Sequence, residues 1–155
     1  MTKALISLSL VTLALLTVQS SVAAEWTYVA PAVGKSPSGA NVKGTMEIDA
    51  TSVAQVDKVV KAWFKLTYKV DVVNPVLAGK PIRKVKFLYY HLCDERKRAL
   101  VQVLYDDASG ATIYSSSYAS AAPKFEDVIP DTTGEAWLEA ACKIAKMKHM
   151  TAAKP

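Results

Sequence analysis

The chain has 155 residues and a formal net charge of +5. Removing a 24-residue signal peptide would leave 131 residues, with 18 Lys and Arg against 14 Asp and Glu, so the net charge becomes +4. This length excludes a second domain. The mildly basic balance favours acidic partners such as polysaccharide or lipid head groups, although solvated surface lysines explain the same charge.

Residues 1–24 have the pattern of a secretory signal peptide. A charge-free apolar run from Ala4 to Val18 is followed by small residues, and Val22 and Ala24 fit positions −3 and −1 of a cleavage site. The run of about 15 residues is shorter than the ~20 that a membrane-spanning helix needs. We therefore expect a mature chain that begins at Glu25, has no membrane span and is periplasmic or secreted.

The cysteines bear on both anchoring and stability. None lies near the cleavage site, where a lipoprotein needs one to carry its acyl chains, so we expect a chain that is not lipid-anchored. The two cysteines are Cys93 and Cys142. In an oxidising compartment a disulfide between them is the default, and closing a loop of about 50 residues stabilises the fold by roughly 4 kcal/mol.

The first part of the mature chain predicts two short strands. Trp26–Ala30 has strand-forming residues, and Pro31–Gly44 is rich in Gly, Pro and Ser, which predicts a loop. Thr45–Asp49 predicts the second strand. Ala50–Val56 has the composition of a helical turn.

The strongest alternation of apolar and polar residues runs from Val60 to Val70. It predicts a strand with one buried face and one face that carries lysines. The residues predicted to be buried are Val60, Ala62, Phe64, Leu66, Tyr68 and Val70.

The following segments predict an antiparallel meander. A loop over Asp71–Pro81 precedes a strand over Ile82–Cys93, and apolar residues on both of its faces indicate a central strand covered on two sides. The charged stretch Asp94–Arg98 turns the chain into a strand over Ala99–Tyr105. A second turn leads to a strand over Thr112–Tyr118.

The last element changes to helical spacing. Thr132 and Glu135 form a capping-box pattern, which predicts that a helix starts there. Cys142 then falls on the apolar face of this helix, as Cys93 falls on the apolar face of its strand, so we expect the helix to lie across the sheet. The apolar face is formed by Leu138, Ala141, Cys142 and Ala145.

Several short motifs, each weak alone, occur in a distinctive order. They are Trp26, a strand that ends in Ile48-Asp49, the aromatic strand centre Trp63-Phe64, the step Tyr90, Cys93 and Arg98, the glycine turn Asp107–Gly110, Pro130 and Cys142. From about Trp26 to Lys143 they resemble the surface-adhesin protein E family of Gram-negative envelope proteins.

The resemblance implies an α+β fold, with a single antiparallel sheet of about six strands and a C-terminal helix packed on one face and tied there by a disulfide. The domain would span residues 25–148, and residues 149–155 would form a flexible tail. The resemblance also implies binding to host matrix or serum proteins. The alternative is a soluble periplasmic protein that binds a small ligand or another component of the envelope.

We find no pattern typical of catalysis, so we expect no enzyme, no cofactor and no metal. A GxSxG elbow and a Cys/His pair with a free thiol are both missing. His91 has no accompanying metal ligands at suitable spacing, which favours a structural histidine beneath the helix. The acidic pairs Asp94-Glu95 and Asp106-Asp107 lie in predicted turns, where aspartate is favoured for backbone hydrogen bonding.

The candidate partner-binding face comprises Lys61, Trp63, Lys65 and Lys69, on the polar side of the long strand. A row of cations with an aromatic residue could bind an acidic protein patch or a polyanion such as a glycan or lipopolysaccharide. We expect no nucleic acid partner. Lysines that protect an exposed strand from association are the alternative explanation, and a second copy of the chain could cover Trp63, so a homodimer stays open.

Overall fold

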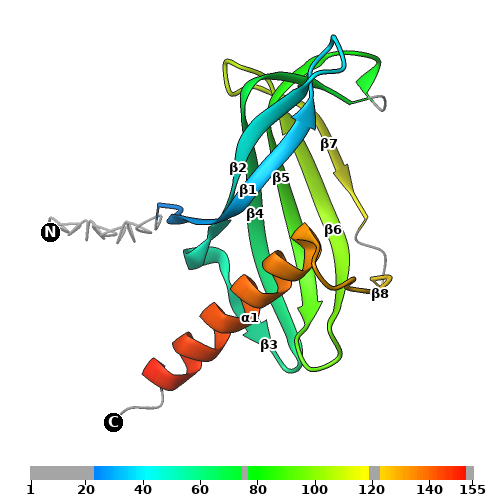
Figure 1. Cartoon of the computed structure of the whole chain (residues 1–155). Helices are drawn as coiled ribbons and strands as arrows, with labels where there is room; N and C mark the ends of the chain where they lie inside the picture. Colours follow the sequence, from blue (N-terminus) through cyan, green and yellow to red (C-terminus); the bar gives the residue numbers. More distant parts are fainter. Residues whose placement is uncertain (1–22, 75–76, 119–122, 153–155) are drawn as a thin grey trace, which may run out of the picture.

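The computed structural model describes residues 23–74, 77–118 and 123–152 as one antiparallel sheet and a C-terminal helix (Figure 1). The strand order is β1-β2-β4-β5-β6-β7, with the short β3 paired to β4 and β8 to β6. The elements are β1 (Trp26–Lys35), β2 (Asn41–Asp49), the 3-10 helix η1 (Ala50–Ser52), β3 (Ala54–Val56), β4 (Val59–Val73), β5 (Pro81–Leu92), β6 (Lys97–Asp106), β7 (Thr112–Ser117), β8 (Glu126–Asp127) and α1 (Thr133–Ala152). The expected fold class is confirmed.

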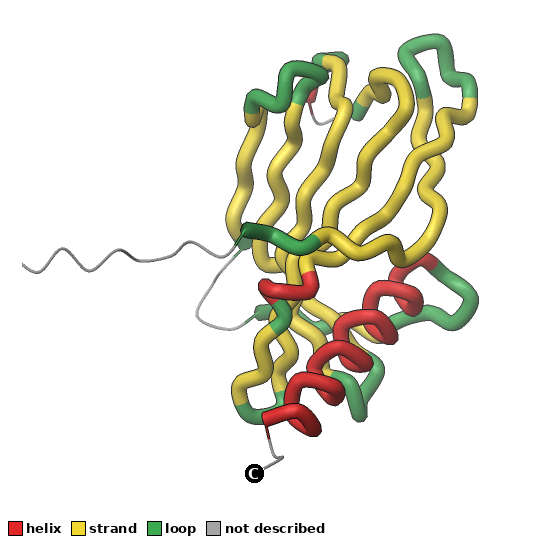
Figure 2. Tube along the Cα trace, turned by 90° about the vertical axis from the view of Figure 1, so that its left-hand side faces the viewer, coloured by secondary structure: helices red, strands yellow, loops and turns green. Residues whose placement is uncertain are grey.

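Helix α1 runs obliquely across one end of the curved sheet (Figures 1 and 2). We call the sheet face under α1 the inner face, and the opposite one the outer face. Phe64 of β4 is fully buried on the inner face, where its ring stacks on Trp137 of α1 with 5.2 Å between centroids. This contact lies at the centre of the main core cluster, which also contains Met46, Ile48, Val60, Ala62, Tyr89, Ala141 and Ala145.

A second core cluster lies beyond the reach of α1. It consists of sheet and loop residues, among them Val42, Val72, Ile82 and Val103, and no residue of α1 belongs to it. The sheet therefore buries this part of its apolar surface by curving over itself.

The disulfide between Cys93 and Cys142 is confirmed, and it closes a separation of 49 residues. Cys93 directly follows β5, and Cys142 lies in the middle of α1, with 5.9 Å between the two Cα atoms. The bond therefore fixes the helix to the end of the central strand β5.

The predicted loop over Pro31–Gly44 is wrong for most of its length. β1 continues through Pro31 to Lys35, and β2 begins at Asn41. The reason is that β1 is an edge strand, where one side of the backbone has no neighbour, so a proline need not remove a ladder hydrogen bond.

The predicted burial of Val70 is also wrong. Val70 is 51% exposed whereas Val72 is buried, and β4 continues to Val73 rather than giving way to a loop at Asp71. The pairing of β4 with β5 shifts register between Thr67 and Val72. Such an irregularity changes which residues point inward, and it cannot be recognised from the alternation alone.

Helix α1 starts at the predicted place but with a different cap. The Glu135 carboxylate accepts a hydrogen bond from the backbone N–H of Asp131 at 2.7 Å, not from that of Thr132. The Thr132 hydroxyl donates to the carbonyl oxygen of Ile129 at 2.7 Å, so it does not cap the helix. The predicted pairing of Thr132 with Glu135 is therefore wrong, although Glu135 does satisfy an N–H just before the helix.

At its other end α1 continues to Ala152, past the expected boundary at residue 148. The Lys148 ammonium donates to the carbonyl oxygens of Val53 at 2.7 Å and Thr51 at 3.3 Å, which ties the last turns to η1. Residues 149–152 are therefore helical, and residues 153–155 of the expected tail lie outside the described part of the chain. In the part of the chain that is described, no helix has the length and apolarity to cross a bilayer.

Candidate binding surfaces

The outer face of the sheet holds most of the predicted partner-binding residues. Across β4 and β5, Lys61 pairs with Tyr90, Trp63 with Leu88 and Lys65 with Lys86. Trp63 is partly buried, and its backbone N–H donates to the Ser52 hydroxyl of η1 at 3.0 Å. The arrangement gives a strip of apolar side chains with lysines at both ends.

Lys65 is not available as a free cation. Its ammonium lies 3.1 Å from the Glu47 carboxylate and 4.2 Å from the ring centroid of Trp26, and its side chain is 17% exposed. Glu47 is its direct partner across β2 and β4. The sequence did not reveal this pairing because it depends on strand register.

The other two predicted lysines are exposed, but they do not form one row. Lys61 follows the regular alternation of β4, whereas Lys69 lies in the register shift between Thr67 and Val72. Neither forms an ion pair with any residue that the structure describes. Lys61, Trp63 and Lys65 thus lie at alternate positions in the regularly paired part of β4, and Lys69 lies in its irregular part.

A buried ion pair on the same face was missed by the sequence analysis. The Lys86 ammonium lies 2.7 Å from the carboxylate of Asp106, whose side chain is 2% exposed and also accepts the Thr112 hydroxyl at 2.8 Å. Asp106 is the last residue of β6 rather than a turn residue. Lys65 of β4 and Lys86 of β5 are direct cross-strand partners, and each forms an ion pair with a different carboxylate.

A hollow of about 460 Å³ adjoins Lys61 on the outer face. Its walls are mostly apolar and come from the hairpin of β3 and β4, from β5 and from the segment before β8. They are formed by Val56, Asp57, Val59, Lys61, Tyr90, Pro123 and Phe125. A chain segment more than sixty positions from Lys61 completes the hollow, so only the tertiary fold could place it.

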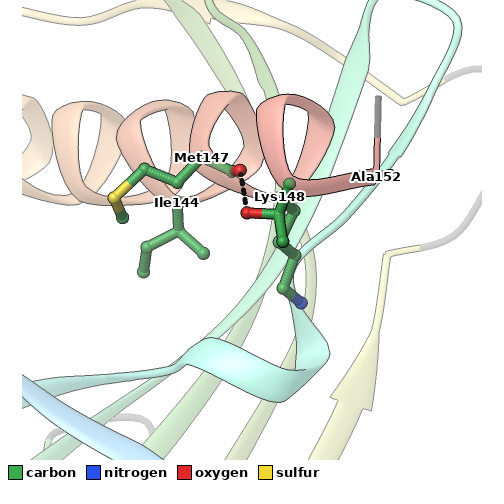
Figure 3. A pocket seen from close by; sticks show the side chains of 5 residues that line it. Ile144, Met147, Lys148 and Ala152 are labelled. Atoms are coloured by element: carbon green, nitrogen blue, oxygen red, sulfur yellow. Dashed lines mark hydrogen bonds between the residues drawn. The ribbon is translucent and has the colours of Figure 1, made fainter. Parts of the chain in front are cut away.

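A second hollow, of about 430 Å³, lies beside the end of α1 (Figure 3). Figure 3 shows Ile144 and Met147 next to it, with the hydrogen bond from the Thr151 hydroxyl to the Met147 carbonyl inside the helix. Lys148 also lines it, but its ammonium is occupied by the carbonyls of Thr51 and Val53. This hollow therefore offers apolar contact and no free charge from Lys148.

His91 is a core residue. Its side chain is fully buried against the rings of Phe64 and Tyr89, at centroid distances of 5.7 and 5.9 Å. Neither ring nitrogen has a hydrogen-bond partner among the described residues. Burial lowers the pKa of His91 to about 4, with the Arg98 cation acting in the same direction. A neutral, structural histidine fits these surroundings.

The turn role predicted for Asp107 is confirmed. Its carboxylate accepts the backbone N–H of Ser109 at 2.8 Å, the Ser109 hydroxyl at 2.6 Å and the N–H of Ala111 at 3.0 Å. The hydrogen bond from the Ser109 side chain is the main reason that the pKa of Asp107 lies below its ordinary value. Among the described residues, no cluster of His, Cys, Asp and Glu side chains could hold a metal ion.

These features define a small sheet-and-helix domain, closed by a disulfide and open for contact on its outer face. The family model of surface-adhesin protein E matches residues 26–143. The chain therefore belongs to the surface-adhesin protein E family. No curated protein sequence matches it.

Three solved structures of Haemophilus influenzae protein E are similar to this chain. Crystal form II shares 15% identity at a TM-score of 0.47 and covers 74% of this chain and 89% of that one. A second structure shares 16% identity at a TM-score of 0.47, and the match covers 78% of this chain and 96% of that one. A third structure, from non-typeable Haemophilus influenzae, shares 16% identity at a TM-score of 0.46, and the match covers 84% of this chain and 92% of that one.

Proposed function

We propose that this protein is an exported, non-catalytic binding module that contacts a host matrix or serum protein through its outer face. Membership of a surface-adhesin family supports the class of function. The observation that carries the choice of face is Trp63, which lies on the sheet side opposite α1, next to the exposed Lys61 and its apolar hollow.

The outer face fits a protein partner better than a uniform polyanion. Lys65 and Lys86 are balanced by Glu47 and Asp106, so the unpaired positive charge near Trp63 is concentrated at Lys61. The contact area combines that charge with apolar walls. Aromatic residues in such settings contribute most of the binding energy of protein interfaces, and rim charges mainly add steering.

Export is supported by the first described residues. The backbone nitrogen of Glu25 donates to the Asp49 carboxylate at 3.1 Å, and Asp49 is 8% exposed. Cleavage before Glu25 would turn this nitrogen into an α-ammonium beside a buried carboxylate, which is a charge-assisted pair. The intact mass of the exported protein tests the cleavage site, and a product that retains residues 1–24 or carries a lipid would contradict it.

Binding to immobilised purified matrix and serum proteins, and to heparin and lipopolysaccharide, tests the proposed face. Trp63→Ala should weaken binding by roughly tenfold or more. Lys61→Ala should weaken it more than Lys65→Ala, since Lys65 already has an internal partner. A double Lys143→Ala, Lys146→Ala variant removes exposed lysines from α1 and serves as the control.

The salt series separates the partner classes. A protein contact centred on Trp63 should lose little affinity between low and physiological salt, whereas a polyanion contact should weaken steeply because ions screen the lysines. Wild-type binding by the folded Trp63→Ala and Lys61→Ala variants to every partner found would exclude the outer face.

A further inference from the structure

A third hollow, of about 370 Å³, lies on the inner face beside α1. Rings and an aliphatic side chain form its walls, and charged side chains lie at its rim. Its lining residues are Tyr89, Arg98, Leu100, Tyr118, Lys124 and Glu126. Half of the lining residues are charged and the other half are aromatic or aliphatic, so the hollow offers both ionic and apolar contacts.

Arg98 is the central charged group of this hollow. Its guanidinium lies 5.1 Å from the ring centroid of Tyr89 and 5.4 Å from that of Trp137. Among the described residues, none forms a hydrogen bond or ion pair with the Arg98 side chain. The rings hold the planar group in place, and its N–H donors stay free, which is a preorganised arrangement for binding a carboxylate.

The first turn of α1 has a glycine where Arg98 packs. A Cβ atom at Gly134 would come within 2.7 Å of the Arg98 Nη1 atom. Gly134 therefore leaves the space that the guanidinium occupies, and any larger residue there would displace it.

The charged side chains at the rim determine which ligand charge the hollow favours. Lys124 and Glu126 are 88% and 70% exposed, and their charged atoms are 3.6 Å apart. Glu126 is also the partner of Arg98 across β8 and β6, so it competes for the guanidinium. With Arg98 and Lys124 positive and Glu126 negative, the hollow has a net charge of +1 and suits a monoanion.

We infer that this hollow, here called the Arg98 hollow, binds a small carboxylic acid with an apolar or aromatic body. The carboxylate meets the guanidinium of Arg98 through two N–H donors, and the body lies against Leu100, Tyr89 and Tyr118. Burial raises the pKa of Tyr89, against the opposing effect of Arg98, so its phenol is protonated at neutral pH and can also donate. A dianion such as phosphate lacks an apolar body and is disfavoured by Glu126.

The test is a titration of the mature, oxidised protein with 4-phenylbutyrate, followed by two-dimensional NMR of backbone amides and arginine side chains. The uncharged 4-phenylbutyramide and inorganic phosphate are the comparison probes. We expect saturable shifts at Arg98, Leu100 and Tyr118 with the carboxylate, and at least about tenfold weaker binding of the amide, because a charge-assisted hydrogen bond is lost.

Four variants sharpen the test. Arg98→Gln should weaken binding by about tenfold or more. Gly134→Ala should give a similar loss without altering any lining residue, since the clash falls on the flexible end of Arg98. Glu126→Gln should tighten binding two- to fivefold, roughly the effect of removing one exposed like charge. Arg83→Gln, which removes a guanidinium paired with Asp71 elsewhere, should change nothing in the Arg98 hollow.

Each outcome of these experiments either supports the inference or overturns it. If Arg98→Gln does not fold, weaker binding by Gly134→Ala together with tighter binding by Glu126→Gln still tests the role of Arg98. Equal binding of acid and amide, no saturable shift with the acid, or a Glu126→Gln variant that binds no tighter would each overturn the inference. Loss of host-protein binding by Trp63→Ala is a separate result, because it concerns the opposite face.

Discussion

Phe64 and Trp63 are neighbours in β4, yet they lie on opposite faces of the sheet. Phe64 is fully buried under α1 and stacks on Trp137, whereas Trp63 is partly buried on a face that α1 does not cover. The inner face is covered by a helix that a disulfide holds in place, whereas outer-face lysines such as Lys65 and Lys86 are held in ion pairs across neighbouring strands. Phe64 under α1 should therefore contribute more to stability than Trp63 does.

The largest expected effect tests this division directly. Phe64→Ala should lower the free energy of unfolding by about 3–5 kcal/mol, because it opens a cavity under α1. Trp63→Ala should cost less, about 1–2 kcal/mol, because its side chain is only partly buried. Urea denaturation of both variants measures the difference, and equal losses would show that the outer face is part of the core.

The disulfide is the next largest contribution. Replacing both Cys93 and Cys142 with serine should lower the free energy of unfolding by about 2–5 kcal/mol. The physical reason is that the unfolded chain regains the freedom of a loop of 49 residues. Thiol titration of the denatured, unreduced wild type is the control, and two free thiols per chain would remove the premise.

His91 should make the inner face sensitive to acid. Its pKa is about 4 in the folded protein, below the ordinary value of 6.5, so the unfolded chain binds a proton first as the pH falls. Stability is therefore full above pH 6.5 and declines toward pH 4, by about 3 kcal/mol at most. His91→Leu should flatten this part of the pH profile, and His149→Gln, on the exposed side of α1, should not.

The smallest expected effects compare two ion pairs of the outer face. Lys86→Met should cost about 1–3 kcal/mol, because it leaves the carboxylate of Asp106 buried with only the Thr112 hydroxyl. Lys65→Met should cost less than about 1 kcal/mol, since Glu47 is more exposed and can be solvated. If Lys65→Met lowers the melting temperature more than Lys86→Met does, the contact of Lys65 with the Trp26 ring contributes more to stability than the burial of Asp106.

Several elements could be predicted from local patterns of residues alone. Alternation in β4 and β5 predicted which residues face the core around Phe64, because side chains of a strand point to opposite faces in turn. Helical spacing placed Cys142 inward, and with Cys93 this predicted the disulfide that the structure contains. The family resemblance over residues 26–143 is confirmed as well.

Other features depend on strand register or on contact between distant segments, so they became visible in the folded protein and not in the residue pattern. Pro31 lies in a strand because β1 is an edge, and Val70 is exposed because β4 shifts register against β5. The same dependence explains why Lys65 is paired with Glu47, whereas Lys61 has no ion-pair partner among the described residues. The Arg98 hollow requires β6, β8 and the first turn of α1 to meet, and no local pattern encodes a meeting of segments separated by so much chain.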